Sequence, residues 1–250
     1  MRYFLEIAYL GKNYFGWQRQ PSEISVQEVL EDCLSTFLRQ NISVVGAGRT
    51  DTGVHAKKMF AHFDSNEIDN FEHFKHRMNS FLPYDIVIHD IFQVKDDAHA
   101  RFDAKSRTYN YVISLKKNPF KHKLAYQIHQ KPDVEKMNRA AEILLNHTDF
   151  QCFSRSRTDV KTYNCIIESA FWKEDGDMLV FSITADRFLR NMVRAIVGTL
   201  LDIGFNKKSV EDLETILQSK NRSMAGASAP AEGLYLMDIV YPKEIRTSNS

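Results

Sequence analysis

The pattern of apolar and polar positions in the first hundred residues predicts six elements. In the stretch SVQEVLEDCLSTFLRQ, apolar residues recur at helical spacing, and Ser25 with Glu28 forms a capping box that marks a helix start. Short apolar runs separated by polar turns indicate strands. The predicted elements are a strand at 2–10, a helix at 25–40, strands at 42–48 and 57–64, a helix at 68–82 and a strand at 85–94. This β-α-β-β-α-β order is that of ferredoxin-like and RNA-recognition-motif (RRM) folds.

A similar pattern begins again in the second part of the chain. The stretch SRTYNYVISL, at 106–115, alternates as a strand does and places Tyr109 and Tyr111 on one side. The elements predicted after it are a helix at 133–147, a hairpin at 163–185 with its turn at 174–177, helices at 188–204 and 209–219, and a strand at 233–241. The plan of the first part is therefore repeated in outline.

The repeated pattern predicts an α+β protein made of two ferredoxin-like or RRM-like halves. We expect mainly antiparallel sheets that meet at a central active-site cleft, because clefts between such halves are common positions for sites. The expected N-terminal half is 1–100, the C-terminal half is 101–242, and 243–250 is a flexible tail.

Composition narrows the class of protein. Of the 250 residues, 43% are hydrophobic and 12% aromatic, which is enough to build a core. The opening MRYFLEIAYL is interrupted by Glu6, and eighteen apolar residues never run together, so we expect a soluble cytoplasmic protein without a signal peptide or membrane span. The three cysteines contain no C-x-x-C spacing, which indicates reduced thiols rather than disulfides or a zinc site.

The charge distribution is more informative than the net charge of +1. Between Asp103 and Asp133 the chain has no acidic residue. The basic residues there are Lys105, Arg107, Lys116, Lys117, Lys121, Lys123 and Lys131, and further basic clusters follow at Arg155, Arg157 and Lys161 and at Arg187, Arg190 and Arg194. This distribution fits either a surface for a polyanion or a solvated loop.

The stretch GAGRTDTGVH, at 46–55, carries the candidate chemistry. Its three glycines permit close backbone approach and positive φ, so Asp51 can stand out of a loop. A bare D-T-G also fits a turn in which the aspartate only caps its own backbone. Arg49 favours a functional interpretation, because a carboxylate beside a guanidinium stays ionised, as a carboxylate nucleophile must.

Other chemistries fit this stretch less well. An aspartic protease needs two carboxylates that share a proton, and no second D-T-G or D-S-G occurs in the chain. The glycines are not followed by G-K-[ST] and do not match a dinucleotide fingerprint. His55 and His62 are not at helical metal spacing, so a packing or RNA-facing role suits them better. No metal and no organic cofactor is implied.

GRTDTGVHA closely resembles the catalytic signature of the tRNA pseudouridine synthase A (TruA) family. The resemblance extends over nearly the whole chain, in the family's order. Its further blocks are FGWQRQ at 15–20 followed by SVQEVLE, NSFLP at 79–83, HARFDAKSRTYNYVI at 99–113, FLRNMVRAIVGTL at 188–200 and AEGLYLMDIVYP at 231–242.

The resemblance implies an isomerase that converts uridine to pseudouridine without a cofactor. Asp51 matches the family's nucleophile, and whether it attacks the base or the sugar stays open. Arg194 matches the arginine that pairs with this aspartate, although its position also suits the polar face of an amphipathic helix. Arg49 matches a position implicated in contacting RNA and displacing the target base.

The resemblance also implies substrate-binding residues. Tyr109 matches the family's substrate-binding tyrosine, which can cover a flipped base, while Tyr111 shares its strand face and equally fits the core. Leu234 is expected to give an apolar wall on the other side of the base, although a leucine there also fits the core. The roles of Arg190 and Asn191 stay open.

The expected partner is tRNA, with targets at uridines 38, 39 and 40 of the anticodon stem-loop, and the family implies a homodimer. The alternative is a non-catalytic RNA-binding protein with tandem RRM-like halves. Such a protein would have no reason to keep Arg49, Asp51 and Arg194 together, and RTYNYVI does not match the usual RRM sheet signature.

Overall fold

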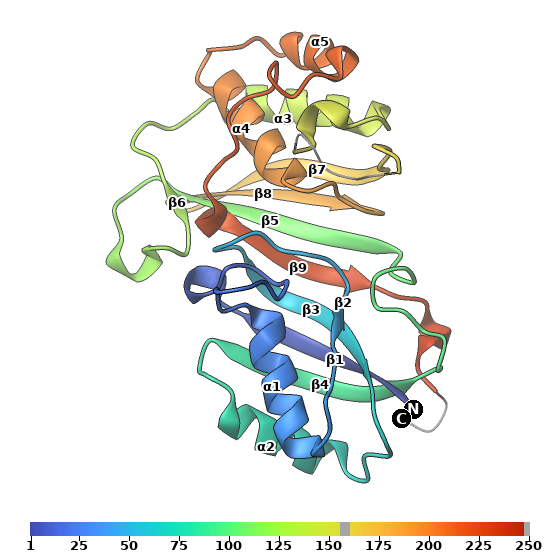
Figure 1. Cartoon of the computed structure of the whole chain (residues 1–250). Coiled ribbons are helices and arrows are strands. Elements are labelled where there is room, and N and C mark those ends of the chain that lie inside the picture. The colour runs from blue at the N-terminus through green and yellow to red at the C-terminus, as the bar shows by residue number, and fades with distance from the viewer. Residues whose placement is uncertain (156–160, 248–250) are drawn as a thin grey trace. The chain divides into compact units, whose positions relative to one another are not determined.

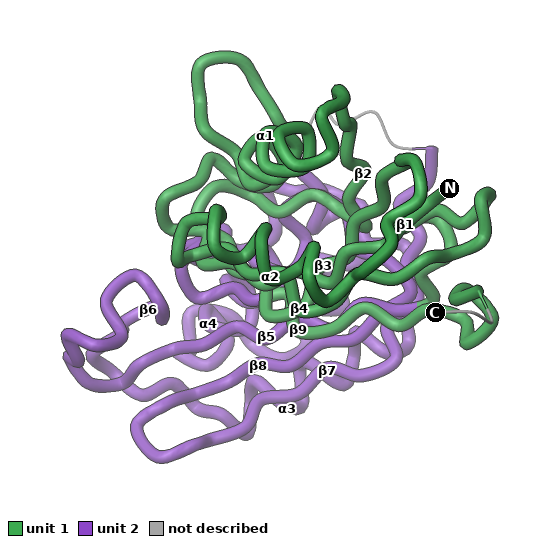
Figure 2. The backbone as a smooth tube through the Cα atoms, turned by 90° about the horizontal axis from the view of Figure 1, so that it is seen from below, with its two compact units in different colours: residues 1–105, 236–250 green, residues 106–235 purple. Residues whose placement is uncertain are grey.

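The structure is a computed structural model that describes residues 1–155 and 161–247. It groups into two compact units, Met1–Lys105 with Leu236–Ser250 as unit 1 and Ser106–Tyr235 as unit 2 (Figure 2). The sequence predicted a break after residue 100 and placed the last strand in the second half. Both units contain helices and mainly antiparallel strands, so the α+β class is confirmed. Among the described residues, no helix has the length and apolar character needed to cross a bilayer.

Unit 1 is built on the sheet order β4-β1-β3-β9. The strands are β1 (Arg2–Tyr9), β3 (His55–Asp64), β4 (Ile86–Val94) and β9 (Leu234–Val240, of which Leu236 onward belongs to this unit), and the short β2 (Val45–Gly46) pairs with β3. β1 is antiparallel to both neighbours, with Phe4 opposite His62 on one side and Phe92 on the other. The antiparallel order β4-β1-β3 fits the predicted β-α-β-β-α-β plan, and β9 adds a strand from the end of the chain.

Two helices cover one face of this sheet (Figure 1). They are α1 (Val26–Leu38) and α2 (Phe71–Phe81), close to the ranges predicted from the sequence. The Ser25 hydroxyl caps α1 by accepting from the Glu28 N–H at 3.2 Å, as expected. The apolar stripes of the two helices bury Leu30, Leu34 and Met78 completely.

The strand expected at 42–48 is almost absent, because only Val45 and Gly46 pair with β3. Side chains of α1 explain the difference. The Ile42 N–H donates to Ser35 Oγ at 3.0 Å, and the Val44 N–H donates to the Glu31 carboxylate at 3.0 Å. The amide groups that would extend the strand are therefore bonded to the helix.

Unit 2 has the antiparallel strand order β5-β8-β7. The strands are β5 (Ser106–Ser114), β8 (Met178–Ala185) and β7 (Ile167–Asp175), and β6 (Tyr126–Gln127) runs parallel to β5. The helices are α3 (Val134–Ile143), α4 (Met192–Gly204) and α5 (Asp212–Ser219). The hairpin turn lies where the sequence predicted it, between Asp175 and Met178.

Helix α4 begins later than the predicted residue 188. Asn191 has φ of 68°, in the left-handed region, so the helix starts at Met192. Short 3-10 helices connect the elements at Gly11–Asn13, Pro119–Lys121, Leu144–Asn146, Gln151–Phe153, Ala231–Gly233 and Lys243–Ile245.

The described part of the expected flexible tail is packed. Ile245 is buried, Arg246 forms an ion pair with Asp90 at 2.8 Å, and its guanidinium lies 3.7 Å from the centroid of the Phe92 ring. Residues 243–247 therefore pack on unit 1, because strand β4 offers a carboxylate and an aromatic face to this segment. Residues 248–250 lie outside the described residues.

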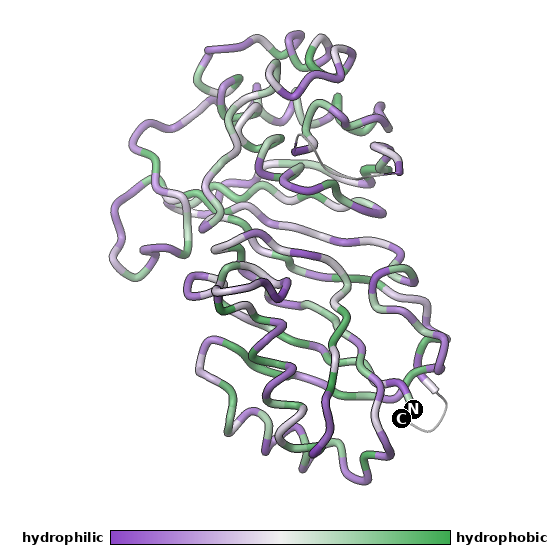
Figure 3. The backbone as a smooth tube through the Cα atoms, viewed as in Figure 1, coloured by the Kyte–Doolittle hydropathy of each residue, from purple (hydrophilic) through white to green (hydrophobic). Residues whose placement is uncertain are grey.

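The three cysteines Cys33, Cys152 and Cys165 are free, in agreement with the reduced thiols that their spacing indicated, and the structure buries all three. Burial raises the pKa of each thiol to about 12. The hydropathy of the chain also agrees with the fold: apolar residues are prominent on the strands of unit 1, and polar residues are prominent on many connecting segments (Figure 3).

Candidate active site

The loop between β2 and β3 presents Asp51, and the segment 11–17 fixes its backbone. The Trp17 N–H donates to the Thr50 carbonyl at 3.2 Å, and the Gly53 N–H donates to the Tyr14 carbonyl at 3.4 Å. The Thr50 hydroxyl is 2.8 Å from the buried hydroxyl of Tyr9. The residues that flank Asp51 are thus held on both sides.

Asp51 itself begins a tight turn. The Val54 N–H donates to the Asp51 carbonyl at 3.1 Å, and Gly53 has φ of 81°, as the third residue of a type II turn requires. Gly16 also has a positive φ, of 86°, and a Cβ there would lie 2.4 Å from the Thr50 carbonyl oxygen. The geometry of the loop thus depends on Gly53 inside it and on Gly16 in the segment that bonds to it.

Arg49 is held by a side chain of the segment before α1. Its Nε donates to Gln18 Oε1 at 3.1 Å. Asp51 is half-buried and Arg49 is exposed. The hydrogen bond to Gln18 therefore orients the guanidinium of Arg49 from outside the Asp51 turn.

The two histidines of this region serve packing. His55 is fully buried, and its Nδ1 accepts from the Gly11 N–H at 3.0 Å. His62 Nδ1 accepts from the Ala100 N–H at 3.1 Å, and burial lowers its pKa to about 4. In the part of the chain that the structure describes, no group of three or more His, Cys, Asp or Glu residues is placed to hold a metal ion.

The two tyrosines of β5 differ in exposure. Tyr111 is fully buried, and its hydroxyl donates to the Pro230 carbonyl at 2.8 Å, which makes it a core residue. Tyr109 is only half-buried, and its ring contacts Phe188 edge to face with the centroids 5.2 Å apart. Of the two rings, that of Tyr109 is therefore the more exposed. Phe188 was not singled out from the sequence, although it begins the FLRN block.

Arg194 lies in the first turn of α4 and is half-buried. Its Nε donates to the Ala229 carbonyl at 2.7 Å, and the Ala229 N–H donates back to the Arg194 carbonyl at 2.9 Å. These bonds fix the guanidinium by its Nε, so Arg194 is more than a solvated residue on the polar face of a helix.

The remaining candidates lie near the same elements of unit 2. Leu234 begins β9 and is 6% exposed, so it is mostly buried. Asn191 donates through its side-chain amide to the Ser228 hydroxyl, and the Arg190 carbonyl accepts from the Arg155 N–H at 3.1 Å.

The segment between β5 and β6 is exposed and basic. Lys117, Lys121 and Lys123 are exposed there, Lys116 forms an ion pair with Asp177 at 2.9 Å, and Phe120 is 86% exposed. Arg157, a member of the second basic cluster, lies outside the described residues.

Comparison with known proteins gives a consistent result. The model of a family described as tRNA pseudouridine synthase matches residues 7–103 and 140–242. A tRNA pseudouridine synthase A of Bacteroides fragilis is 51% identical over 246 residues, which cover 98% of each chain. Its counterpart in Porphyromonas gingivalis is 50% identical over 248 residues, again with 98% of each chain covered. Another, from Parabacteroides distasonis, is 47% identical over 245 residues, with 98% of this chain and 97% of the relative covered.

A solved structure of a dye-decolorizing protein from V. cholerae aligns with a TM-score of 0.20 and 9% identity, covering 98% of this chain and 94% of its own, and this likeness carries no argument. The sequence relatives confirm the resemblance drawn from the motif blocks, and the family match includes Asp51, Arg194 and Leu234. The chain therefore belongs to the tRNA pseudouridine synthase family of isomerases.

Proposed function

We propose that the protein isomerises uridine to pseudouridine at positions 38, 39 and 40 of the tRNA anticodon stem-loop, with Asp51 as the nucleophile. In this reaction the glycosidic bond from C1′ to N1 breaks, the base turns, and a bond from C1′ to C5 forms, while C5 loses its proton and N1 takes one up. The reaction needs no oxidant and no group carrier. The observation that carries the proposal is the fixed turn at Asp51 in a chain that matches the family on both sides of it.

The proposed role of Tyr109 is to cover the extruded base. Removing a base from its stack costs a few kcal/mol, and stacking on an aromatic ring returns about 1–3 kcal/mol. The half-buried ring of Tyr109, braced by Phe188, suits this role. Leu234 is proposed to give the apolar wall on the other side of the base.

The proposed role of Arg194 is to pair with Asp51 while both act on the same nucleotide. An opposite charge within hydrogen-bonding distance favours the ionised form of a carboxylate, which is the nucleophilic form. Since Arg49 bonds to Gln18, Arg194 takes over the electrostatic role that the sequence analysis gave to Arg49. Arg49 is proposed to contact the RNA and displace the target base.

The proposed surroundings follow from charge. The exposed lysines at 116–123 suit the phosphates of an RNA stem, which is recognised mainly through its backbone and shape. We further propose a cytoplasmic homodimer as the active form.

The test of the nucleophile uses tRNA labelled with tritium at C5 of uridine. Asp51→Asn should bind tRNA as the wild type does but release no tritium, whereas Asp97→Asn, at an exposed position of the same unit, should behave as the wild type. Equal tritium release by the wild type and Asp51→Asn would refute the proposal. A wild type that binds tRNA and releases none would favour the non-catalytic RNA-binding protein.

Two further measurements examine the details. Mapping pseudouridine in transcripts that carry a single uridine at 38, 39 or 40 tests the target positions. If Arg194 acts through Asp51 rather than by binding RNA, Arg194→Ala should lower the rate of pseudouridine formation strongly while tRNA affinity stays near that of the wild type. A loss of tRNA affinity as large as the loss of rate would contradict the proposed pairing.

A further inference from the structure

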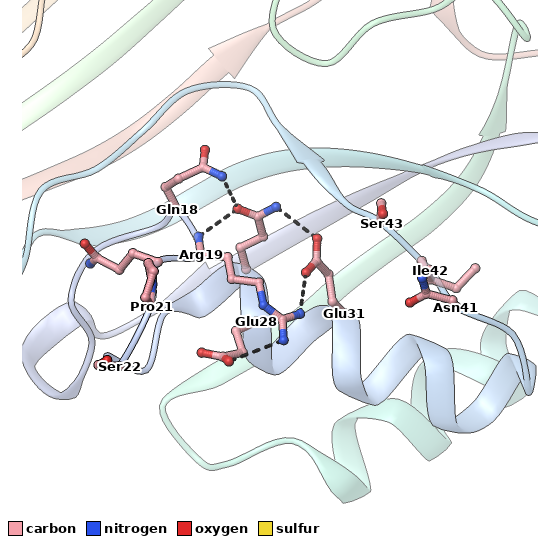
Figure 4. A pocket seen from close by; sticks show the side chains of 11 residues that line it. Gln18, Arg19, Pro21, Ser22, Glu28, Glu31, Asn41, Ile42 and Ser43 are labelled. Atoms are coloured by element: carbon pink, nitrogen blue, oxygen red, sulfur yellow. Dashed lines mark hydrogen bonds and ion pairs between the residues drawn. The ribbon is translucent and has the colours of Figure 1, made fainter.

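A chain of polar side chains runs from the interior of unit 1 to Arg49. It consists of Glu31 and Gln27 on α1 and Gln18 in the segment before the helix, and it lines the hollow drawn in Figure 4. Gln27 and Glu31 are only 9% and 7% exposed, on a helix face otherwise filled by apolar residues. Burying polar groups costs free energy unless each is hydrogen-bonded, so this chain calls for an explanation beyond packing.

Glu31 is the fixed inner end of the chain. Its Oε1 accepts from the Val44 N–H at 3.0 Å and from Gln27 Nε2 at 2.9 Å. Its Oε2 accepts from the Arg19 guanidinium at 3.1 Å. Since both of its oxygens accept, the group that faces Oε1 from Gln27 must be a donor.

The donor that Glu31 requires fixes the orientation of the Gln27 side-chain amide. Its Nε2 donates its two hydrogens to Glu31 and to the Val44 carbonyl, the latter at 2.9 Å. Its Oε1 must therefore point outward, where it accepts from the Arg19 N–H at 2.9 Å and from Gln18 Nε2 at 2.8 Å. A reversed amide would place an oxygen against two acceptors, so only one orientation is compatible with the surrounding groups.

Gln18 is thereby oriented as well, although its side chain is exposed. Its Nε2 faces Gln27, so its Oε1 faces Arg49 and accepts from Nε at 3.1 Å. Holding an arginine by its Nε fixes the plane of the guanidinium and leaves the two terminal nitrogens directed away from the contact.

We propose that Gln18 is a positioning residue that sets the orientation of Arg49, with Gln27 and Glu31 as its buried anchor. Gln18 does not touch the RNA in this proposal; it acts through the guanidinium of Arg49. The inference depends on the proposed function only in that Arg49 must contribute to the reaction. It explains why α1 keeps two polar side chains in its buried face.

The test measures single-turnover pseudouridine formation and, separately, tRNA affinity for Gln18→Ala, Arg49→Ala and the double variant. Gln18→Ala should lower the rate by about 10- to 150-fold, as expected for the loss of one hydrogen bond to a charged group, with tRNA affinity changed less than the rate. In the Arg49→Ala background, the same substitution should change neither. Gln20→Ala is the matched control, because this exposed glutamine of the same segment donates to the Phe15 carbonyl and not to Arg49.

A second variant tests the order of donors and acceptors among these side chains. Gln18→Glu keeps an acceptor for Arg49 but places a carboxylate oxygen against Gln27 Oε1, so it should recover less than the full rate. A loss in Gln18→Ala that persists in full when Arg49 is already alanine would overturn the positioning role, as would a Gln18→Ala rate equal to that of Gln20→Ala. If Arg49→Ala itself has the wild-type rate, the proposed role of Arg49 fails instead, so the two failures are distinguishable.

Discussion

Substituting Gly16 by alanine tests how the Asp51 loop is held. A Cβ at this position would lie 2.4 Å from the Thr50 carbonyl oxygen, 3.1 Å from the Asp51 carbonyl carbon and 3.3 Å from the Thr52 N atom. The backbone φ of 86° is itself unfavourable for alanine, by about 1–2 kcal/mol. Overpacking at a site that is already filled adds about 1–3 kcal/mol. We therefore expect Gly16→Ala to lower the free energy of unfolding by about 2–5 kcal/mol.

The assay is urea unfolding followed by circular dichroism, together with single-turnover tritium release under conditions where the variant is folded. The methyl group presses on all three backbone units from 50 to 52, so activity should fall along with stability. Gly48→Ala is the control for stability, because a Cβ there meets nothing within 4 Å, and its free energy of unfolding should change by less than about 0.5 kcal/mol. If Gly16→Ala and Gly48→Ala unfold at the same urea concentration, the reasoning is refuted.

Three further predictions concern protonation and capping. The folded-state pKa of His62, lowered to about 4 by burial, lies below its ordinary value of 6.5, so its stabilising contribution is complete above 6.5 and is lost as the pH falls towards 4. His62→Asn keeps an acceptor for the Ala100 N–H and should flatten the pH dependence of urea unfolding in that interval; an unchanged slope would contradict this. Cys33, Cys152 and Cys165 should resist a thiol reagent at pH 8 in the native protein and react at once in guanidinium, whereas prompt native labelling would refute their burial. Ser25→Ala should cost about 1 kcal/mol in urea unfolding through loss of the α1 cap, and Ser43→Ala, at an exposed position, should cost none.

The sequence predicted the long elements well because their apolar periodicity and their packing agree. The helices at Val26–Leu38 and Phe71–Phe81 lie within the predicted ranges. The strand predicted at 42–48 is mostly missing because backbone amides of this stretch bond to the side chains of Ser35 and Glu31. Hydrogen bonds of this kind cannot be predicted from the pattern of apolar residues. The start of α4 was predicted too early, because the left-handed backbone of Asn191 makes the helix begin at Met192 although the apolar pattern continues before it.

In the candidate site, too, the sequence indicated the main features but not the contacts between distant segments. The motif indicated a turn at Asp51 and favoured Tyr109 over Tyr111, and the structure adds that Tyr109 is half-buried and Tyr111 fully buried. Sequence spacing suggested that Arg49 serves Asp51, two residues away. Its observed partner, Gln18, lies more than thirty positions earlier in the chain and is brought close by the packing of segment 11–17 under the loop.

Unit 1 is assembled from two separate pieces of the chain, Met1–Lys105 and Leu236–Ser250. On the ribosome, residues 1–105 emerge first. In the sheet, β3 lies between β1 and β9, and the part of β9 that belongs to unit 1 is translated only after all of unit 2. The part of the β3 edge that β2 does not cover therefore stays unpaired while the 130 residues of unit 2 are synthesised, and an unpaired strand edge is a site of wrong association between nascent chains. A stop codon anywhere before β9 would therefore leave unit 1, whose other strands are translated first, without one of its strands.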